Sequence, residues 1–212
     1  MPSYTLRDTK GSALSFAELD NNYIASQAAS RFPTACIFTP PSSYFINQAM
    51  CGSAALTTGN SIADYILLTP FQVPYDLTID QVGVWQTSAG SISLRVLIYT
   101  SDADGRPSSK DAETATITTA QNSNTISLSH TFNANTLYWV GTHTSGAETF
   151  RKIDDRCLLS WSTSVATALN ATAYATSLEL TSTSVGSAPT NWSFASSQYT
   201  SNTPISIGFR AA

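Results

Sequence analysis

The chain has 212 residues, a formal net charge of −4 and an isoelectric point near 4.9, and 11% of its residues are charged. This length allows one well-buried core, or one domain with an arm. The ten lysines and arginines are scattered, whereas proteins that bind phosphate backbones cluster them, so nucleic acid is excluded as an expected partner.

Ser and Thr occupy about 60 positions, many of them alternating with Val, Ile and Leu. Thr favours strands, and hydroxyl groups form hydrogen bonds without a strong charge field. Such a surface favours neutral, hydroxyl-rich partners or other copies of the chain. No run approaches the roughly 18 apolar residues of a membrane-spanning helix, so we expect no membrane insertion.

The N-terminal residues predict an extended polar arm over 1–12, followed by one short α-helix. Ser15 is a candidate N-cap with Glu18 three residues later, which is a capping box. We expect the helix to run to about residue 29, before Pro33. The opening residues lack the basic-then-apolar layout of a secretory signal, so no export is expected.

The expected helix has an apolar side. Leu14 and Leu19 are placed to form a hydrophobic staple, and Phe16, Leu19 and Tyr23 fall on one face. One short helix cannot bury such a stripe alone. We therefore predict that Leu14, Phe16, Leu19 and Tyr23 serve attachment or oligomerisation.

After residue 40 the pattern changes to short strands separated by turn residues. The clearest strand spans 91–99, where Ile92, Leu94, Val96 and Ile98 alternate with other residues and predict one buried face. Further strands are expected at 44–48, 62–69, 77–87, 114–119, 125–129, 137–142, 157–162 and 205–210. Residues 163–204 predict long loops with one strand near 177–180. The fold class is therefore all-β, with an N-terminal arm and helix (1–40) before a β-sandwich or jelly-roll domain (41–212).

Residues 5–22, TLRDTKGSALSFAELDNN, resemble a segment with the pattern KGSxLTxxELDNNF at the N-termini of phage tail-fibre and related virion proteins. Tyr23 stands where that pattern has Phe. The resemblance implies that this segment faces the virion.

Residues 64–140 are similar to a β-sandwich module near the C-termini of phage tail proteins. The similar stretches, in order, are PF at 70–71, VP at 73–74, TIDQVGV at 78–84, IY at 98–99, DGRP at 104–107 and LYWV at 137–140. Leu97 stands where the module often has Gly. The two resemblances together imply a virion protein with an attachment segment and a β-sandwich tip.

No catalytic motif is visible, and His130 and His143 are the only histidines. Both are interpreted as ordinary strand-end residues, so we expect no enzyme activity and no cofactor or metal. Asp102 and Asp104 favour a turn over a calcium loop, because the further oxygen ligands of such a loop are missing. The charged run 151–156 is either a solvated hairpin with local ion pairs or an intersubunit salt-bridge cluster.

The cysteines Cys36, Cys51 and Cys157 lack C-x-x-C spacing, which favours buried free thiols over a Cys36–Cys51 disulfide. Trp85 and Trp139 lie in expected strands and are predicted to be core residues.

Four aromatic residues lie at or beyond the last clear strands. They either pack loops over the sandwich or contact a receptor. These residues are Trp161, Tyr174, Trp192 and Tyr199.

The expected function is a short tail fibre, a homotrimer with a receptor-binding β tip and no enzyme activity. Its expected partners are other virion proteins and a host cell-surface glycan or protein. A capsid-decorating head fibre and a polysaccharide depolymerase are the alternatives. The expected location is the virion, on the tail or the capsid surface, after synthesis in the host cytoplasm.

Overall fold

The computed structural model describes residues 42–43, 45–47, 56–153, 177–180, 184–195, 198–200 and 202–212. The chain divides into two units, and all of these residues belong to the second, Pro40–Ala212. They form two antiparallel sheets packed as a β-sandwich, which confirms the predicted all-β fold. The expected arm and helix lie outside the described residues, as do Cys36, Cys51 and Cys157. In the described part, no helix is long and apolar enough to cross a membrane.

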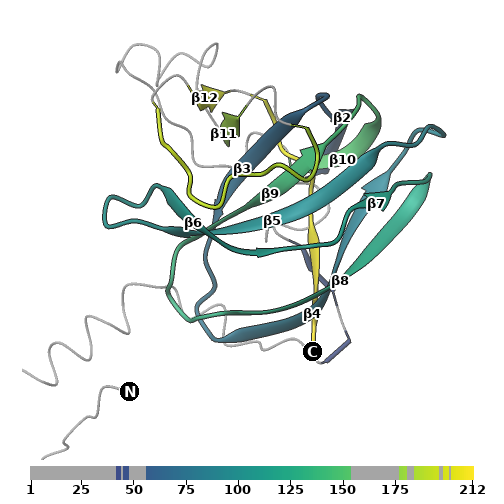
Figure 1. Ribbon diagram of the computed structural model, residues 1–212. Helices are drawn as coiled ribbons and strands as arrows, with labels where there is room; N and C mark the ends of the chain where they lie inside the picture. The colour runs from purple at the N-terminus through teal and green to yellow at the C-terminus, as the bar shows by residue number, and fades with distance from the viewer. Residues whose placement is uncertain are drawn as a thin grey trace, which may run out of the picture. The chain divides into compact units, whose positions relative to one another are not determined.

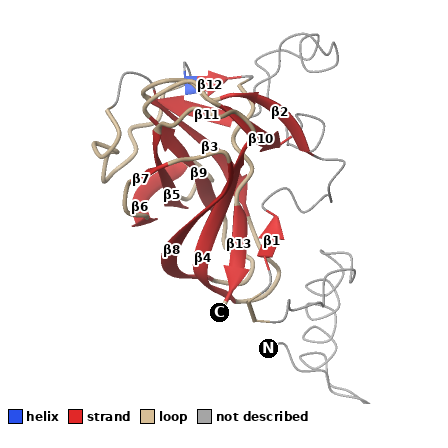
Figure 2. Ribbon diagram, turned by 90° about the vertical axis from the view of Figure 1, so that its right-hand side faces the viewer, coloured by secondary structure: helices blue, strands red, loops and turns tan. Residues whose placement is uncertain are grey.

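The first sheet, sheet A, has six strands. They are β1 (Phe45–Asn47), β2 (Leu56–Asn60), β4 (Leu77–Gln86), β8 (Asn122–Phe132), β10 (Thr149–Ile153) and β13 (Gly208–Ala211). Figure 2 shows β8, β4, β13 and β1 side by side, in agreement with their hydrogen bonding. The pair β2 and β10 extends the sheet beyond the end of β13.

The second sheet, sheet B, has seven strands. They are β3 (Tyr65–Phe71), β5 (Ser93–Ser101), β6 (Pro107–Glu113), β7 (Ile117–Thr118), β9 (Tyr138–Thr144), β11 (Ser177–Leu180) and β12 (Tyr199–Thr200). Strand β9 lies between β3 and β5 at the centre of the sheet. Figure 1 shows these strands in front of sheet A.

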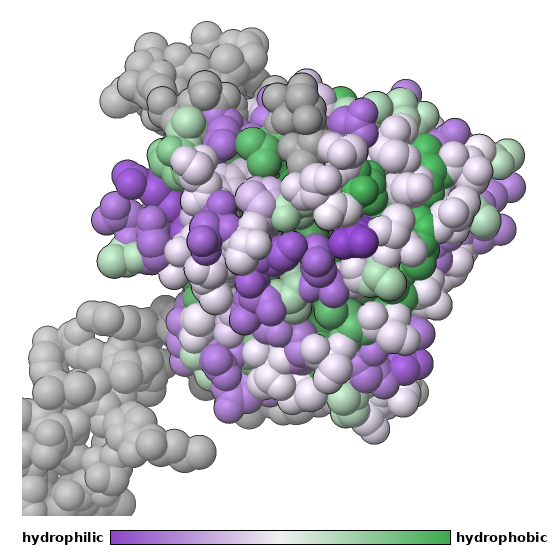
Figure 3. Space-filling model, in the orientation of Figure 1, coloured by the Kyte–Doolittle hydropathy of each residue, from purple (hydrophilic) through white to green (hydrophobic). Residues whose placement is uncertain are grey.

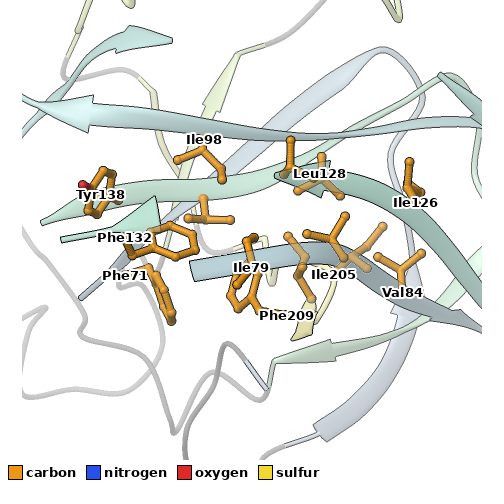
Figure 4. Packing of buried hydrophobic residues seen from close by; sticks show 14 of the residues in the cluster. Phe71, Ile79, Val84, Ile98, Ile126, Leu128, Phe132, Tyr138, Ile205 and Phe209 are labelled. Carbon is orange, nitrogen blue, oxygen red and sulfur yellow. The ribbon is translucent and has the colours of Figure 1, made fainter. Parts of the chain in front are cut away.

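The main core lies between the two sheets, where both contribute aromatic rings. The Phe71 ring from β3 lies 4.9 Å, centroid to centroid, from both Phe132 of β8 and Phe209 of β13. Figure 4 shows these rings beside Ile79 and Ile98. The last strand of the chain is therefore part of the core and joins β4 to β1.

Strand β5 is buried on both faces. Leu94, Val96 and Ile98 face the main core, as the alternation predicts. Leu97 and Tyr99 point the other way and are also fully buried, so the expectation of a half-buried strand is wrong. The reason is that residues 184–195 cross the outer face of sheet B in Figure 1 and cover it.

Strand β4 contains a β-bulge between Ile79 and Gln81. The extra residue resets the alternation, so Ile79 and Val82 both face the core although they are three positions apart. Asp80, at the bulge, accepts two hydrogen bonds of 2.7 Å from the Arg210 guanidinium. These hydrogen bonds lower the pKa of Asp80 and tie the C-terminal strand to β4.

The predicted strands recur with shifted boundaries, and the expected strand at 114–119 shrinks to β7. The expected strand at 157–162 lies outside the described residues. Strands β2, β6, β10 and the two-residue β12 were not predicted. Strand β6 begins at Pro107, directly after the predicted turn at Asp102 and Asp104, and pairs with β5.

Candidate ligand-binding groove

Two large apolar side chains are exposed on the outer face of sheet A. Among the described residues, Phe45 of β1 is 48% exposed and Trp85 of β4 is 47% exposed, and these are the exposed large hydrophobic side chains. Both line one groove, so their exposure is concentrated in one place rather than scattered.

The prediction that Trp85 is a core residue is wrong. Val84 and Gln86 of β4 point into the sandwich, so Trp85 between them must point out. The hydrophobic alternation of the strand contains this signal, because Val82 and Val84 set the buried face. The expectation for Trp139 is confirmed: it is 4% exposed and its Nε1 donates to the Gly105 carbonyl at 2.9 Å.

The Phe45 ring lies over two glycines that face each other across β4 and β13. A Cβ on Gly83 would lie 3.4 Å from Phe45 Cε1, and one on Gly208 would lie 3.3 Å from Phe45 Cδ1. Gly208 is paired with Gly83 in the ladder. The missing side chains thus make room for the ring and leave a flat floor beside it.

The groove has a volume of about 390 Å³. Its walls and floor combine aromatic, small and hydroxyl-bearing residues from β1, β2, β4, β8, β10 and β13. They are Phe45, Leu56, Gly83, Val84, Trp85, Ser123, Thr125, Arg151, Ser206 and Gly208. This volume is near the lower end of the range for small-molecule pockets, roughly 300–1,000 Å³.

Hydroxyl groups line the side of the groove formed by β8. Ser123 is paired with Trp85 and Thr125 with Gly83, and both side chains are exposed. Polar edges beside flat aromatic faces can bind a ring that has apolar faces and a hydroxyl-bearing rim.

Arg151 of β10 supplies the positive charge of the groove, and its side chain is exposed. Within the described part of the chain, no carboxylate forms an ion pair with it, whereas Arg95 and Lys110 pair with Glu113. Arg106 and Arg210 also have carboxylate partners, Asp104 and Asp80. An exposed guanidinium can bind the carboxylate or phosphate oxygens of an external anion.

The charged run 151–156 begins inside a strand, so its interpretation as a solvated hairpin is wrong for the described residues 151–153. Arg151 and Lys152 belong to β10, which pairs with β2 over its whole length. Lys152 is only 6% exposed, its Cδ lies close to Gly59, and burial lowers the pKa of its amine. Asp154, Asp155 and an intersubunit cluster lie outside what the structure describes.

Of the residues predicted to contact a receptor, Trp192 is the one whose side chain the structure describes. Trp192 is 7% exposed and belongs to the second cluster, which covers sheet B. Its ring makes an edge contact with Tyr99 at 5.4 Å, and its Nε1 donates to Gln198 Oε1 at 3.0 Å. Trp192 thus packs a loop over the sandwich. This was one of the two interpretations of the four aromatic residues, the other being receptor contact.

The structure does not describe the side chains of the other predicted site residues. Tyr199 lies in β12, opposite Leu178 of β11, and is described by its backbone alone. The remaining ones lie outside the described residues: Trp161, Tyr174, Leu14, Phe16, Leu19 and Tyr23.

Both histidines lie close to strand ends, as expected: His143 is the second-last residue of β9 and His130 the third-last of β8. His143 of β9 is fully buried and therefore cannot reach a solvent-borne substrate. His130 of β8 has its Nε2 3.7 Å from Asp111 Oδ2, and burial lowers its pKa although Asp111 opposes this. These positions give no support to acid–base chemistry in the groove.

The turn predicted at Asp102 is confirmed. Its Oδ1 accepts hydrogen bonds from the backbone N–H groups of Asp104 at 3.0 Å and Arg106 at 2.8 Å. Gly105 has a φ of +77°, a conformation that glycine adopts without strain. Asp104 forms an ion pair with Arg106, with 3.1 Å between Asp104 Oδ2 and Arg106 Nη1. The two aspartates thus have structural partners within the turn.

A scan of protein-family models and a search of curated proteins gave no match to this chain. The groove residues Phe45 and Arg151 were not singled out from the sequence. Phe45 lies in a three-residue strand, too short for an alternation, and Arg151 was attributed to a charge cluster.

Proposed function

We propose that this chain is a structural protein of a bacteriophage virion, a short tail fibre whose β-sandwich binds a host receptor without catalysing a reaction. Residues 5–22 would attach it to the particle, since they resemble the N-terminal segment of phage virion proteins. Three copies would form the fibre.

The fold supports this proposal. The resemblance of residues 64–140 to a phage tail module implies a β-sandwich, and that stretch forms β3 to β9, which include strands of both sheets. Because many unrelated functions share sandwich folds, the functional argument depends on the site rather than on the fold.

The groove on sheet A is the observation that carries the receptor-binding role. Two exposed aromatic rings, those of Phe45 and Trp85, line it together with hydroxyl groups and one guanidinium. The surface seen in Figure 3, over sheet B, instead mixes hydrophilic and weakly polar residues with small hydrophobic patches. A concave surface with aromatic faces and a few polar groups is typical of binding sites.

Competition with phage adsorption tests the proposal. The purified full chain, added to host cells before the phage, is expected to reduce the number of particles that adsorb. Light scattering is expected to give three times the mass of one chain. Unchanged adsorption at saturating protein would count against a receptor-binding fibre.

Antibody labelling of intact particles tests the location. Label on the tail is expected, and label on the capsid surface would favour the head-fibre alternative, which could use the same N-terminal segment. Release of oligosaccharides from host polysaccharide by the purified chain would favour the depolymerase alternative.

A further inference from the structure

The charge in the groove distinguishes it from a purely apolar patch. Arg151 is exposed, lines the groove and has no carboxylate partner among the described residues, in a chain whose net charge is −4. The other exposed or half-buried arginines that the structure describes, Arg95, Arg106 and Arg210, are all paired with acidic side chains. A guanidinium offers a planar fork that binds carboxylate or phosphate oxygens in pairs.

The apolar surface of the groove consists mainly of two flat rings and glycine backbone. The Trp85 and Phe45 rings come from β4 and β1, and Gly83 and Gly208 lie beneath the Phe45 ring. Flat aromatic rings suit the apolar faces of sugar units.

Hydroxyl groups on β8 form part of the polar lining of the groove. Ser123 and Thr125 stand beside Trp85 and Gly83 on the same outer face, where they can exchange hydrogen bonds with the hydroxyl groups of a sugar. The volume of about 390 Å³ accommodates a small ligand rather than a polymer in its full width.

We infer that the groove binds a saccharide that carries a negatively charged group, with Trp85 stacked on a sugar ring and Arg151 bound to the anion. This inference rests on the proposed receptor-binding function and names the class of receptor. A single site of this kind is weak, and a trimer would strengthen it through multivalent attachment.

The test is binding of the full-length protein to matched saccharide pairs. Each uronic acid oligosaccharide is compared with its carboxyl-reduced form, and each phosphorylated oligosaccharide with its dephosphorylated form, by calorimetry at low salt. The charged member of at least one pair is expected to bind about tenfold more tightly. The two kinds of pair show whether the anion is a carboxylate or a phosphate. Equal binding within every pair, or no binding at all, would overturn the inference.

Two groove variants and one control locate the binding. Arg151→Gln is expected to remove the preference for the charged member, and Trp85→Ala to weaken binding of both members about tenfold. Arg106→Gln, which removes another exposed arginine outside the groove, should leave both unchanged. Thermal melting and light scattering confirm that each variant is folded and has the mass of the wild type. A changed mass for Trp85→Ala would show instead that the groove is a contact between copies of the chain.

The adsorption assay separates this inference from the function on which it rests. If the wild type and both groove variants block adsorption equally, receptor binding stands and the groove is not its site. If the charged saccharide binds through Arg151 but the protein never blocks adsorption, the groove inference stands and the receptor-binding role is wrong.

Discussion

His130 is a largely buried ionisable residue whose protonation affects the stability of the fold. It lies in β8 with its ring 4.6 Å from Phe132 and 5.6 Å from Tyr138. Burial lowers its pKa below the usual value of 6.5, and the nearby Asp111 opposes this shift only in part. The folded state therefore binds fewer protons than the unfolded state between the lowered pKa and 6.5.

The domain is therefore expected to lose stability in acid. The contribution of neutral His130 to the free energy of unfolding is complete above pH 6.5 and is lost as the pH falls through the lowered pKa. His130→Phe, which keeps an aromatic ring beside Phe132, is expected to reduce the loss of unfolding free energy between about pH 7.5 and about pH 5. Urea denaturation at both pH values measures this loss.

Asp111→Asn is the matched control for the histidine variant. It removes the charge that favours protonated His130, so the loss of stability in acid should become larger. If neither variant changes the difference between the two pH values, another group controls the acid sensitivity.

At the scale of an element, strand β9 shows how closely neighbouring strands approach each other within sheet B. A Cβ on Gly141 would overlap the backbone carbonyl oxygen of Leu67 and approach Leu68 Cα at 2.9 Å. Since backbone atoms of β3 cannot move without breaking the pairing, Gly141→Ala should destabilise the domain by about 3 kcal/mol or more. Chemical denaturation of the variant checks this value.

Gly59→Ala provides the comparison in an edge strand. Its Cβ would meet Lys152 Cδ at 3.1 Å, and this is a flexible side chain that can move aside. We expect a change within about 1 kcal/mol, because alanine is also better suited than glycine to a strand. Similar losses for both variants would contradict the backbone clash at Gly141.

The sequence predicted strands best where burial imposes a period of two. Strands β4 and β5 were placed correctly because each has a row of core residues, such as Leu94 and Val96. The strand at 177–180 was also found. In contrast, β2, β6 and β10 were missed. Strands β2 and β6 end the main paths of their sheets and carry polar residues, so they lack a regular pattern.

The candidate groove was less predictable than the fold, for a physical reason. It depends on which face of the sheet Trp85 occupies and on how Phe45 lies over glycines from two distant strands. The first could be derived from Val82 and Val84, which fix the buried face of β4. The second requires the pairing of β1, β13 and β4, which the sequence does not contain.

At the scale of the whole molecule, two C-terminal segments complete the sandwich in different ways. The C-terminal strand β13 joins the core through Phe209, and residues 184–195 cover the outer face of sheet B through Trp192. Hydrogen bonds from Tyr99 Oη to the Pro189 carbonyl and from the Trp192 N–H to the Ser108 carbonyl fix this covering. The groove lies on the other sheet, so this covering leaves it open.

The chain divides into two units between Thr39 and Pro40, so the proposed attachment and receptor-binding functions are expected to be separable by mutation. Leu19 lies on the apolar side of the helix expected in the first unit, and the described cores draw all their residues from the second. Leu19→Asp is therefore expected to prevent incorporation into virions while the β-sandwich keeps its melting temperature. Asn21→Asp adds the same charge away from that apolar side and should be incorporated normally, as measured by immunoblotting of purified particles. Normal incorporation of Leu19→Asp would show that this side of the segment does not attach the protein, whereas a lowered melting temperature would show that Leu19 stabilises the β domain.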